Sequence, residues 1–177
     1  LVGQAIWQSL PTHEDLYINS FIKGMQSNDS LISEQDFSSL IAKRRHIEKL
    51  ITAKNNLSTA DTFFSSLKKQ KNIICVLPDR IYYRQINAGT GETVQHLTAS
   101  VIASYEIRTL ADSLISYQPL TESTLFLPLA EMIPGLAKGI IGMREGAIRE
   151  IFVHPEYGYP KQFEDHLGLV IKTELQK

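Results

Sequence analysis

The sequence has 177 residues, 43% hydrophobic and 21% charged, a balance typical of a globular protein with a hydrophobic core and not of a disordered chain. Eighteen basic residues stand against nineteen acidic ones, and this formal charge of -1 gives no electrostatic reason to expect nucleic acid or an anionic membrane as a partner. The longest apolar runs, 73–77 and 125–130, fall far short of the roughly 20 residues of a membrane-spanning helix, so we expect no integral membrane segment.

The first 30 residues predict two short amphipathic helices, one on each side of Pro11, because apolar side chains recur at helical spacing in both. Such short helices carry more apolar surface than they can bury against each other. The partner we expect is the same segment of a second copy of the chain. The sequence therefore predicts a homodimer. Its interface residues would be Ile6, Trp7, Leu10, Tyr17, Phe21 and Met25.

A longer helix is predicted to begin at the capping sequence Ser33–Asp36, where Ile32 is placed as a hydrophobic staple. Apolar positions keep helical spacing for about thirty residues, but they thin out between residues 52 and 62. We expect solvent on most sides of this helix and packing at its two ends. Asn55-Asn56, followed by a second cap-like stretch, leaves a break in the helix open as an alternative.

After Lys71 the hydrophobic pattern changes from helical to alternating, which predicts an antiparallel sheet. One helical stretch, Gly135–Met143, is just long enough to cover one face of that sheet. We predict an α+β chain in which residues 1–32 form a helical arm, 33–70 a connecting helix and 71–177 the sheet domain. The predicted strand runs are Ile73–Leu77, Arg80–Ile86, Leu97–Thr109, Leu125–Leu129, Ala147–Val153 and Leu169–Leu175.

The residue types that bind metals and cofactors show no site pattern. The five histidines are scattered with no pair at ligand spacing, so we expect surface histidines, no metal and no cofactor. The single cysteine, Cys75, excludes an internal disulfide. Its place in an apolar strand run predicts an inert, buried thiol.

The most informative segment is Met132–Tyr159. It reads Met-Ile-Pro-Gly-Leu-Ala-Lys-Gly-Ile-Ile-Gly-Met and then Arg-Glu-Gly-Ala-Ile-Arg-Glu-Ile-Phe-Val-His-Pro-Glu-Tyr-Gly-Tyr. About a dozen positions, in order and spacing, resemble the FKBP signature of strand end, helix, glycine turn, strand and Pro-x-x-x-Tyr. The local chemistry agrees, because Pro134 suits a helix start and Leu136, Ile140 and Met143 recur on one helix face.

The resemblance extends upstream to Phe21–Gln26, to the start of the long helix and to Leu77–Gly91, and it indicates the macrophage infectivity potentiator (Mip) branch of the FKBP-type peptidyl-prolyl isomerases. It implies an antiparallel half-barrel of five or six strands wrapped on one short helix. A long helix would hold this domain away from a dimer core of intertwined amino-terminal helices.

The same resemblance implies that the ligand is a proline-containing or unfolded polypeptide and that the protein is periplasmic, on the outer surface or secreted. The residues from Leu1 onward show no signal-peptide pattern, so such a peptide was cleaved, trimmed or never existed.

The functional residues of the FKBP family carry over unevenly onto this chain. The pocket tyrosines match Tyr105 and Tyr159, and the backbone donor to the substrate carbonyl matches Ile133, beside Met132. Four other pocket features of the family are replaced: a Phe-Asp pair, a pocket Phe, a floor Trp and a last-strand Phe. The residues at those positions are Ile115-Ser116, Leu127, Leu136 and Ile171.

Loss of the carboxylate and of ring surface should weaken prolyl binding and the fit to the transition state, although the cavity can stay apolar. We expect feeble isomerase activity or none. A non-catalytic dimeric clamp and a secreted host-interaction protein are alternatives that would use the same pocket. A further alternative is that Tyr105, Ile133 and Tyr159 persist only as core and corner residues.

Overall fold

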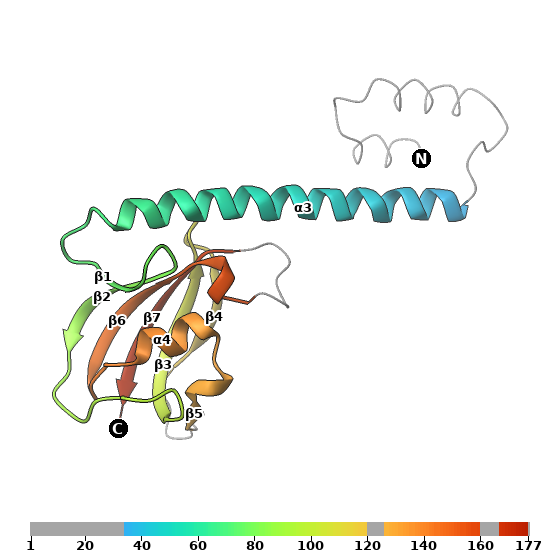
Figure 1. Ribbon diagram of the computed structural model, residues 1–177. Helices are drawn as coiled ribbons and strands as arrows, with labels where there is room; N and C mark the ends of the chain where they lie inside the picture. The colour runs from blue at the N-terminus through green and yellow to red at the C-terminus, as the bar shows by residue number, and fades with distance from the viewer. Residues whose placement is uncertain (1–33, 120–125, 160–166, 177) are drawn as a thin grey trace, which may run out of the picture. The chain divides into compact units, whose positions relative to one another are not determined.

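The computed structural model describes residues 34–119, 126–159 and 167–176 (Figure 1). The two short helices predicted before residue 30, with all six predicted interface residues, lie outside these ranges. The chain divides into two compact units, residues 1–47 and 48–177, and the second contains the whole sheet. Within the described ranges, no helix is both long and apolar enough to cross a membrane.

Helix α3 runs without a break from Glu34 to Leu67. The break considered at Asn55-Asn56 does not occur. The hydroxyls of Thr59 and Thr62 donate hydrogen bonds back to the carbonyls of Asn55 and Ser58, at 2.9 and 3.0 Å, so the cap-like residues lie inside the helix. The buried side chains recur along one face of its second half: Ala53, Ala60, Phe64 and Leu67.

The described residues form seven strands in one antiparallel sheet, in the order β1-β2-β6-β7-β3-β4, with β5 paired to another part of β3. The predicted α+β fold with an antiparallel half-barrel is therefore confirmed, with seven strands among the described residues where five or six were expected. The predicted strand runs omit β4, a five-residue stretch in which Ile115 and Tyr117 alternate with Ser116 and Gln118. The strands are β1 (Ile74–Leu77), β2 (Ile81–Ala88), β3 (Ser100–Thr109), β4 (Leu114–Gln118), β5 (Leu127–Pro128), β6 (Ala147–Val153) and β7 (Leu169–Gln176).

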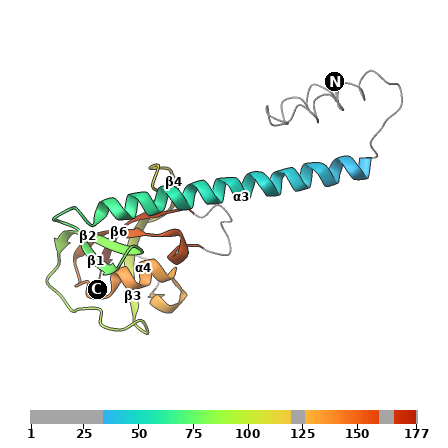
Figure 2. The same cartoon turned by 45° about the horizontal axis from the view of Figure 1, so that its top comes forward.

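Helix α4 (Pro134–Ile140) lies against one face of the sheet, which we call the inner face (Figure 2). It ends earlier than predicted, before Gly142, whose φ of 77° suits glycine. Gly139 allows the helix to approach β6 closely, since a Cβ atom there would lie 2.5 Å from Cγ2 of Ile151. The predicted cover of the sheet by one short helix is therefore present.

Two hydrophobic cores lie on opposite faces of the sheet. The inner core joins α4 to the buried face of the strands and contains Ile107, Ile151 and Ile171. The outer core forms where the last turns of α3 pack on the other face, which we call the outer face, and its rings include Phe64 and Phe152. Both cores belong to the unit of residues 48–177.

Cys75 corrects one expectation from the sequence. It lies on β1, which among the described strands pairs with β2 alone and forms an edge of the sheet, and its thiol is exposed instead of buried. The apolar run around it does not mark a core strand, because Ile74 and Val76 are also exposed.

Candidate functional site

Two cross-strand rows on the inner face position the candidate site. Ile107 on β3 lies opposite Ile171 on β7, and Ile171 lies opposite Ile151 on β6. In the next row, Tyr105 lies opposite Thr173. Side chains two residues apart share one face of a strand, so Tyr105 projects from the same face as the isoleucine row.

Tyr105 and Tyr159 are half-buried and pack against the inner core. Tyr159 follows the short 3-10 helix η2 (Pro155–Tyr157), in which Pro155 is buried and fixes the turn. Burial raises the pKa of Tyr159 above its ordinary value, and the nearby Tyr105 acts in the same direction. The phenol of Tyr159 therefore stays protonated at neutral pH and keeps its capacity to donate a hydrogen bond.

Ile133 is the residue at which the chain enters α4. Its backbone is extended, with φ -58° and ψ 139°, and its carbonyl accepts the first helical hydrogen bond, from Ala137 N at 3.1 Å. Its own N–H donates to none of the residues that the structure describes. A helix start leaves such N–H groups available, and this one can serve an incoming carbonyl.

Ile115 and Ser116 lie at a β-bulge in β4. Ser116 pairs with Ile107 and Leu114 pairs with Arg108, so Ile115 is the extra residue. A bulge re-aims side chains locally, and Ile115 packs against the inner core. Ser116 stands at the end of the isoleucine row, at the position where the resemblance to the FKBP family implies a carboxylate.

The remaining predicted ligand-binding residues divide into two groups. Leu127 on β5 and Met132 are half-buried, and Met132 packs against the inner core. Leu136 and Ile171 are 4% and 0% exposed, so they form the floor beneath the other side chains and not an open surface.

A groove of about 270 Å³ lies elsewhere, on the outer face, and Leu110 and Val170 contribute its apolar wall. Its polar lining includes part of a cross-strand charge ladder on β6, β7 and β3, in which the lysine of β7 lies opposite a glutamate on each side. Charges of alternating sign opposite one another stabilise a sheet, so we interpret this groove as a structural surface. The ladder residues are Glu150, Lys172 and Glu106.

Sequence reasoning missed Arg149, which is 5% exposed on β6. Its guanidinium donates to the carbonyls of Gly139, Ile141 and Gly142, at 2.8, 2.9 and 3.0 Å, and so satisfies the carboxyl end of α4. Burial lowers the pKa of Arg149 from its ordinary value. The available signal was a charged residue in the inward phase of the apolar run Ala147–Val153.

His154 was expected at the surface, and that expectation is wrong. The residue is completely buried, because α3 covers it and its ring contacts Phe64 edge-on at 5.4 Å between centroids. No signal in the local sequence distinguishes it, since the covering helix is more than eighty residues away along the chain. Among the described residues, no three His, Cys, Asp or Glu side chains form a group that could hold a metal ion.

Comparisons with known proteins match the sheet-forming part of the chain to a family and nearly the whole chain to individual relatives. Residues 91–173 match the family described as FKBP-type peptidyl-prolyl cis-trans isomerase. The chain is 24% identical over 181 residues to the peptidyl-prolyl cis-trans isomerase Mip of Chlamydia trachomatis, covering 98% of this chain and 74% of that protein. It is 26% identical over 183 residues to the Mip of Chlamydia muridarum, with the same coverage of 98% and 74%.

A solved structure gives the same result for the fold. The crystal structure of FkpA from Escherichia coli covers 99% of this chain, which in turn covers 90% of FkpA, with a TM-score of 0.74 and 17% identity. The sequence relatives, the matched family and the fold agree with the FKBP signature at Met132–Tyr159. Residues 91–173 therefore belong to the family of FKBP-type peptidyl-prolyl cis-trans isomerases, and the chain as a whole is similar to the Mip proteins.

Proposed function

We propose that this chain binds proline-containing or unfolded polypeptide on the inner face and isomerises prolyl bonds there more slowly than relatives with a full set of pocket groups. The observation that supports the proposal is that Tyr105, Ile133 and Tyr159 all pack against the inner core, whose side chains are aliphatic. Hydrogen-bond donors are retained, whereas the carboxylate and most rings are replaced.

Isomerisation requires rotation about a peptide bond with a barrier of about 18–20 kcal/mol, and it needs no covalent step. In the twisted state the amide loses resonance. An apolar site disfavours the more polar planar amide, and fixed donors hold the neighbouring carbonyls. Here the N–H of Ile133 and the protonated Tyr159 would hold the substrate, and Leu136 and Ile171 would exclude water from below.

The expected loss of activity has a physical reason at each replaced position. Ser116 offers no negative charge, and Leu127 and Ile171 offer no ring face to the prolyl group. Aromatic contacts beyond simple area burial contribute about 0.5–1.5 kcal/mol each. The summed loss is enough for a rate at least about tenfold below that of a full-pocket relative.

A proline-limited refolding assay tests this function. We expect the purified full chain to accelerate the slow phase of a client protein that waits on a trans-to-cis prolyl bond, with kcat/KM well below that of a full-pocket FKBP run in parallel. No acceleration at any concentration, together with measurable binding of the unfolded client, would instead support a non-catalytic clamp. The replaced aromatic groups are the observation that favours this second candidate.

We also propose that the chain forms a homodimer, with residues 1–32 as the dimerisation arm, 33–70 as the connecting helix and 71–177 as the FKBP-like domain. We propose in addition that the protein is located in the periplasm, on the outer surface or outside the cell. Support comes from the Mip relatives, which match 98% of the chain, including the arm. Sedimentation of the full chain should give a two-fold dimer at concentrations on the order of tens of micromolar, and a monomer there would refute the arm assignment.

A further inference from the structure

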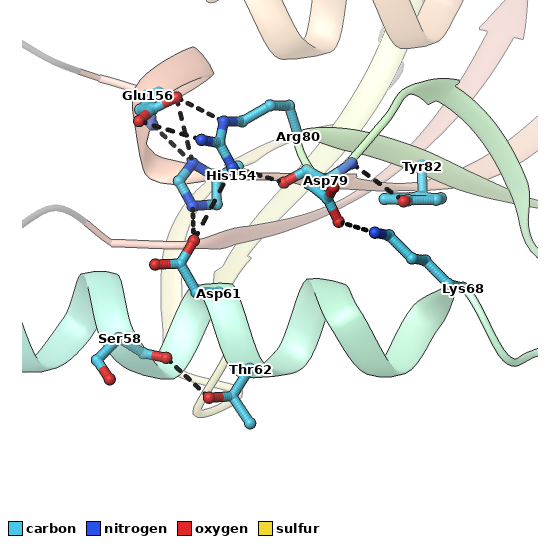
Figure 3. Close-up of polar contacts among 9 residues, drawn as sticks. All are labelled: Ser58, Asp61, Thr62, Lys68, Asp79, Arg80, Tyr82, His154 and Glu156. Carbon is cyan, nitrogen blue, oxygen red and sulfur yellow. Dashed lines mark hydrogen bonds and ion pairs between the residues drawn. The ribbon is translucent and has the colours of Figure 1, made fainter.

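A polar cluster joins the last turns of α3 to the sheet domain beside the outer core (Figure 3). His154 Nε2 lies 3.2 Å from Oδ1 of Asp61 on α3. On its other side the backbone N–H of Glu156 points to Nδ1 at 3.4 Å. Arg80, just before β2, reaches both carboxylates, at 2.5 Å from Glu156 Oε2 and 3.9 Å from Asp61 Oδ1.

The hydrogen bonds fix which nitrogen carries the proton in the neutral ring. Because the Glu156 N–H donates to Nδ1, that nitrogen must be the acceptor, and the single ring proton of the neutral form lies on Nε2. From Nε2 it points to Asp61 and so connects the helix to the sheet domain. A second proton, on Nδ1, would face the Glu156 N–H and break that hydrogen bond.

Charged groups from three elements face the ring, and they act in opposite directions. Burial lowers the pKa of His154 below its ordinary value of 6.5, and the positive charge of Arg80 lowers it further, while Asp61 and Glu156 raise it. The net direction is downward. The packed ring edge of Phe64 on α3 leaves no water beside the imidazole to solvate a second charge.

We propose that His154 and Asp61 form a pH-sensitive latch, in which protonation of the buried ring loosens the last turns of α3 from the outer face of the sheet. The proposal is independent of any prolyl isomerase activity. Loosening would expose the apolar side chains that α3 now covers, among them Phe152 and Tyr82.

The sign of the pH dependence follows from linkage. An undocked histidine takes up a proton as the pH falls below about 6.5, whereas the docked ring resists protonation to lower pH. The undocked state therefore binds more protons in this window. Docking is fully stable above about pH 6.5 and weakens as the pH falls through the pKa of the docked ring.

Hydrogen exchange of the full chain, read by mass spectrometry at about pH 7.5 and about pH 5.5 and corrected for intrinsic exchange, tests the latch. Protection of residues 55–67 should fall at least about twofold more than that of β6 and β7 on acidification. The side chain of His154→Gln keeps a hydrogen-bond donor near the position of Nε2 but cannot be protonated. In this variant the additional loss of protection of residues 55–67 on acidification should therefore be absent. His96→Gln, the same change at an exposed histidine, should behave like the wild type.

The proposal would be overturned if residues 55–67 lost as much protection on acidification in His154→Gln as in the wild type. It would also be overturned if, in the wild type, these residues lost no more protection than β6 and β7. A second measurement holds even if the His154→Gln chain does not fold. In an NMR titration of the wild type, His154 should protonate below the ordinary histidine value of 6.5, and a titration midpoint for His154 at or above 6.5 would also overturn it.

Discussion

The guanidinium of Arg149 lies over the ring of Tyr83, with its Cζ atom 3.9 Å from the ring centroid. The same guanidinium donates through Nε to Oε1 of Gln85 at 2.9 Å and through its other nitrogens to the end of α4. One buried side chain thus connects β2, β6 and α4, the elements that carry the inner face. Positioning of α4, and with it Ile133, depends on this contact set.

Replacing Arg149 with leucine should lower the free energy of unfolding by about 2–4 kcal/mol, because three carbonyls at the end of α4 lose their donor in a buried setting. Arg149→Lys should cost less, since a single ammonium restores part of the hydrogen bonding. Urea unfolding followed by far-ultraviolet circular dichroism measures both. Arg144→Leu, at an exposed position, is the matched control. Equal stability of Arg149→Leu and Arg144→Leu would contradict this account.

Removal of the Tyr159 hydroxyl separates a catalytic role from a structural one. Tyr159→Phe keeps the half-buried ring and should change the free energy of unfolding by no more than about 1.5 kcal/mol. If the phenol holds the substrate, kcat/KM for prolyl isomerisation should still fall by roughly threefold or more. Tyr117→Phe, on the exposed edge strand β4, should leave the rate unchanged. An unchanged kcat/KM in Tyr159→Phe would show that this tyrosine has only a structural role.

The signature segment could be read from the sequence because its fold depends on local chemistry. Pro134 opens α4, Gly139 permits close approach to β6, and alternation marks the inward face of Ala147–Val153. Those features are encoded within about twenty-five residues of one another. The helix, the strand after it and the antiparallel sheet could all be predicted for that reason.

Long-range packing was not readable in the same way. The face of α3 that docks on the sheet begins with Ala53 and Ala60, small residues that give no strong apolar stripe. For the same reason the burial of His154 could not be predicted from the sequence, since its cover comes from α3. The prediction that Cys75 is buried was wrong for the opposite reason. An apolar strand has the pattern of a core strand, and only the sheet order shows that this one lies at the edge.

Restoring the family's acid and ring at the bulge of β4 should raise activity. In the double variant Ile115→Phe with Ser116→Asp, we expect kcat/KM to increase by up to about tenfold, equivalent to about 1.4 kcal/mol in the barrier. The reason is the position of Ser116 at the end of the inner isoleucine row and of Ile115 against the inner core. Ser113→Asp adds the same charge at an exposed position outside the row and should have no effect.

Two outcomes of the same assay would contradict this explanation. A wild-type rate that already equals that of a full-pocket relative would show that the replaced side chains matter little. A double variant that folds, as judged by circular dichroism, yet gains nothing would show that the loss lies elsewhere in the site.

The part of the chain that folds on its own should begin near residue 48 and not at residue 71. The outer core takes Phe64 and Leu67 from α3, which are 0% and 2% exposed, and packs them on Phe152. A chain of residues 71–177 leaves that face of β6 uncovered, and burying a side chain of this kind contributes about 1.5–3 kcal/mol. We therefore expect residues 48–177 to unfold cooperatively and residues 71–177 to be less stable by several kcal/mol.

Urea unfolding of the two truncated chains, followed by circular dichroism, measures the difference, since the single tryptophan, Trp7, is absent from both. Phe64→Ala within residues 48–177 should reproduce much of the loss, at about 3–5 kcal/mol, because it empties a fully buried site. Ile51→Ala, on the same helix but 54% exposed, should cost little. If the chain of residues 71–177 proved as stable as the longer one, the last turns of α3 would be a passive connection, and the outer core would contribute nothing to the stability of the FKBP domain.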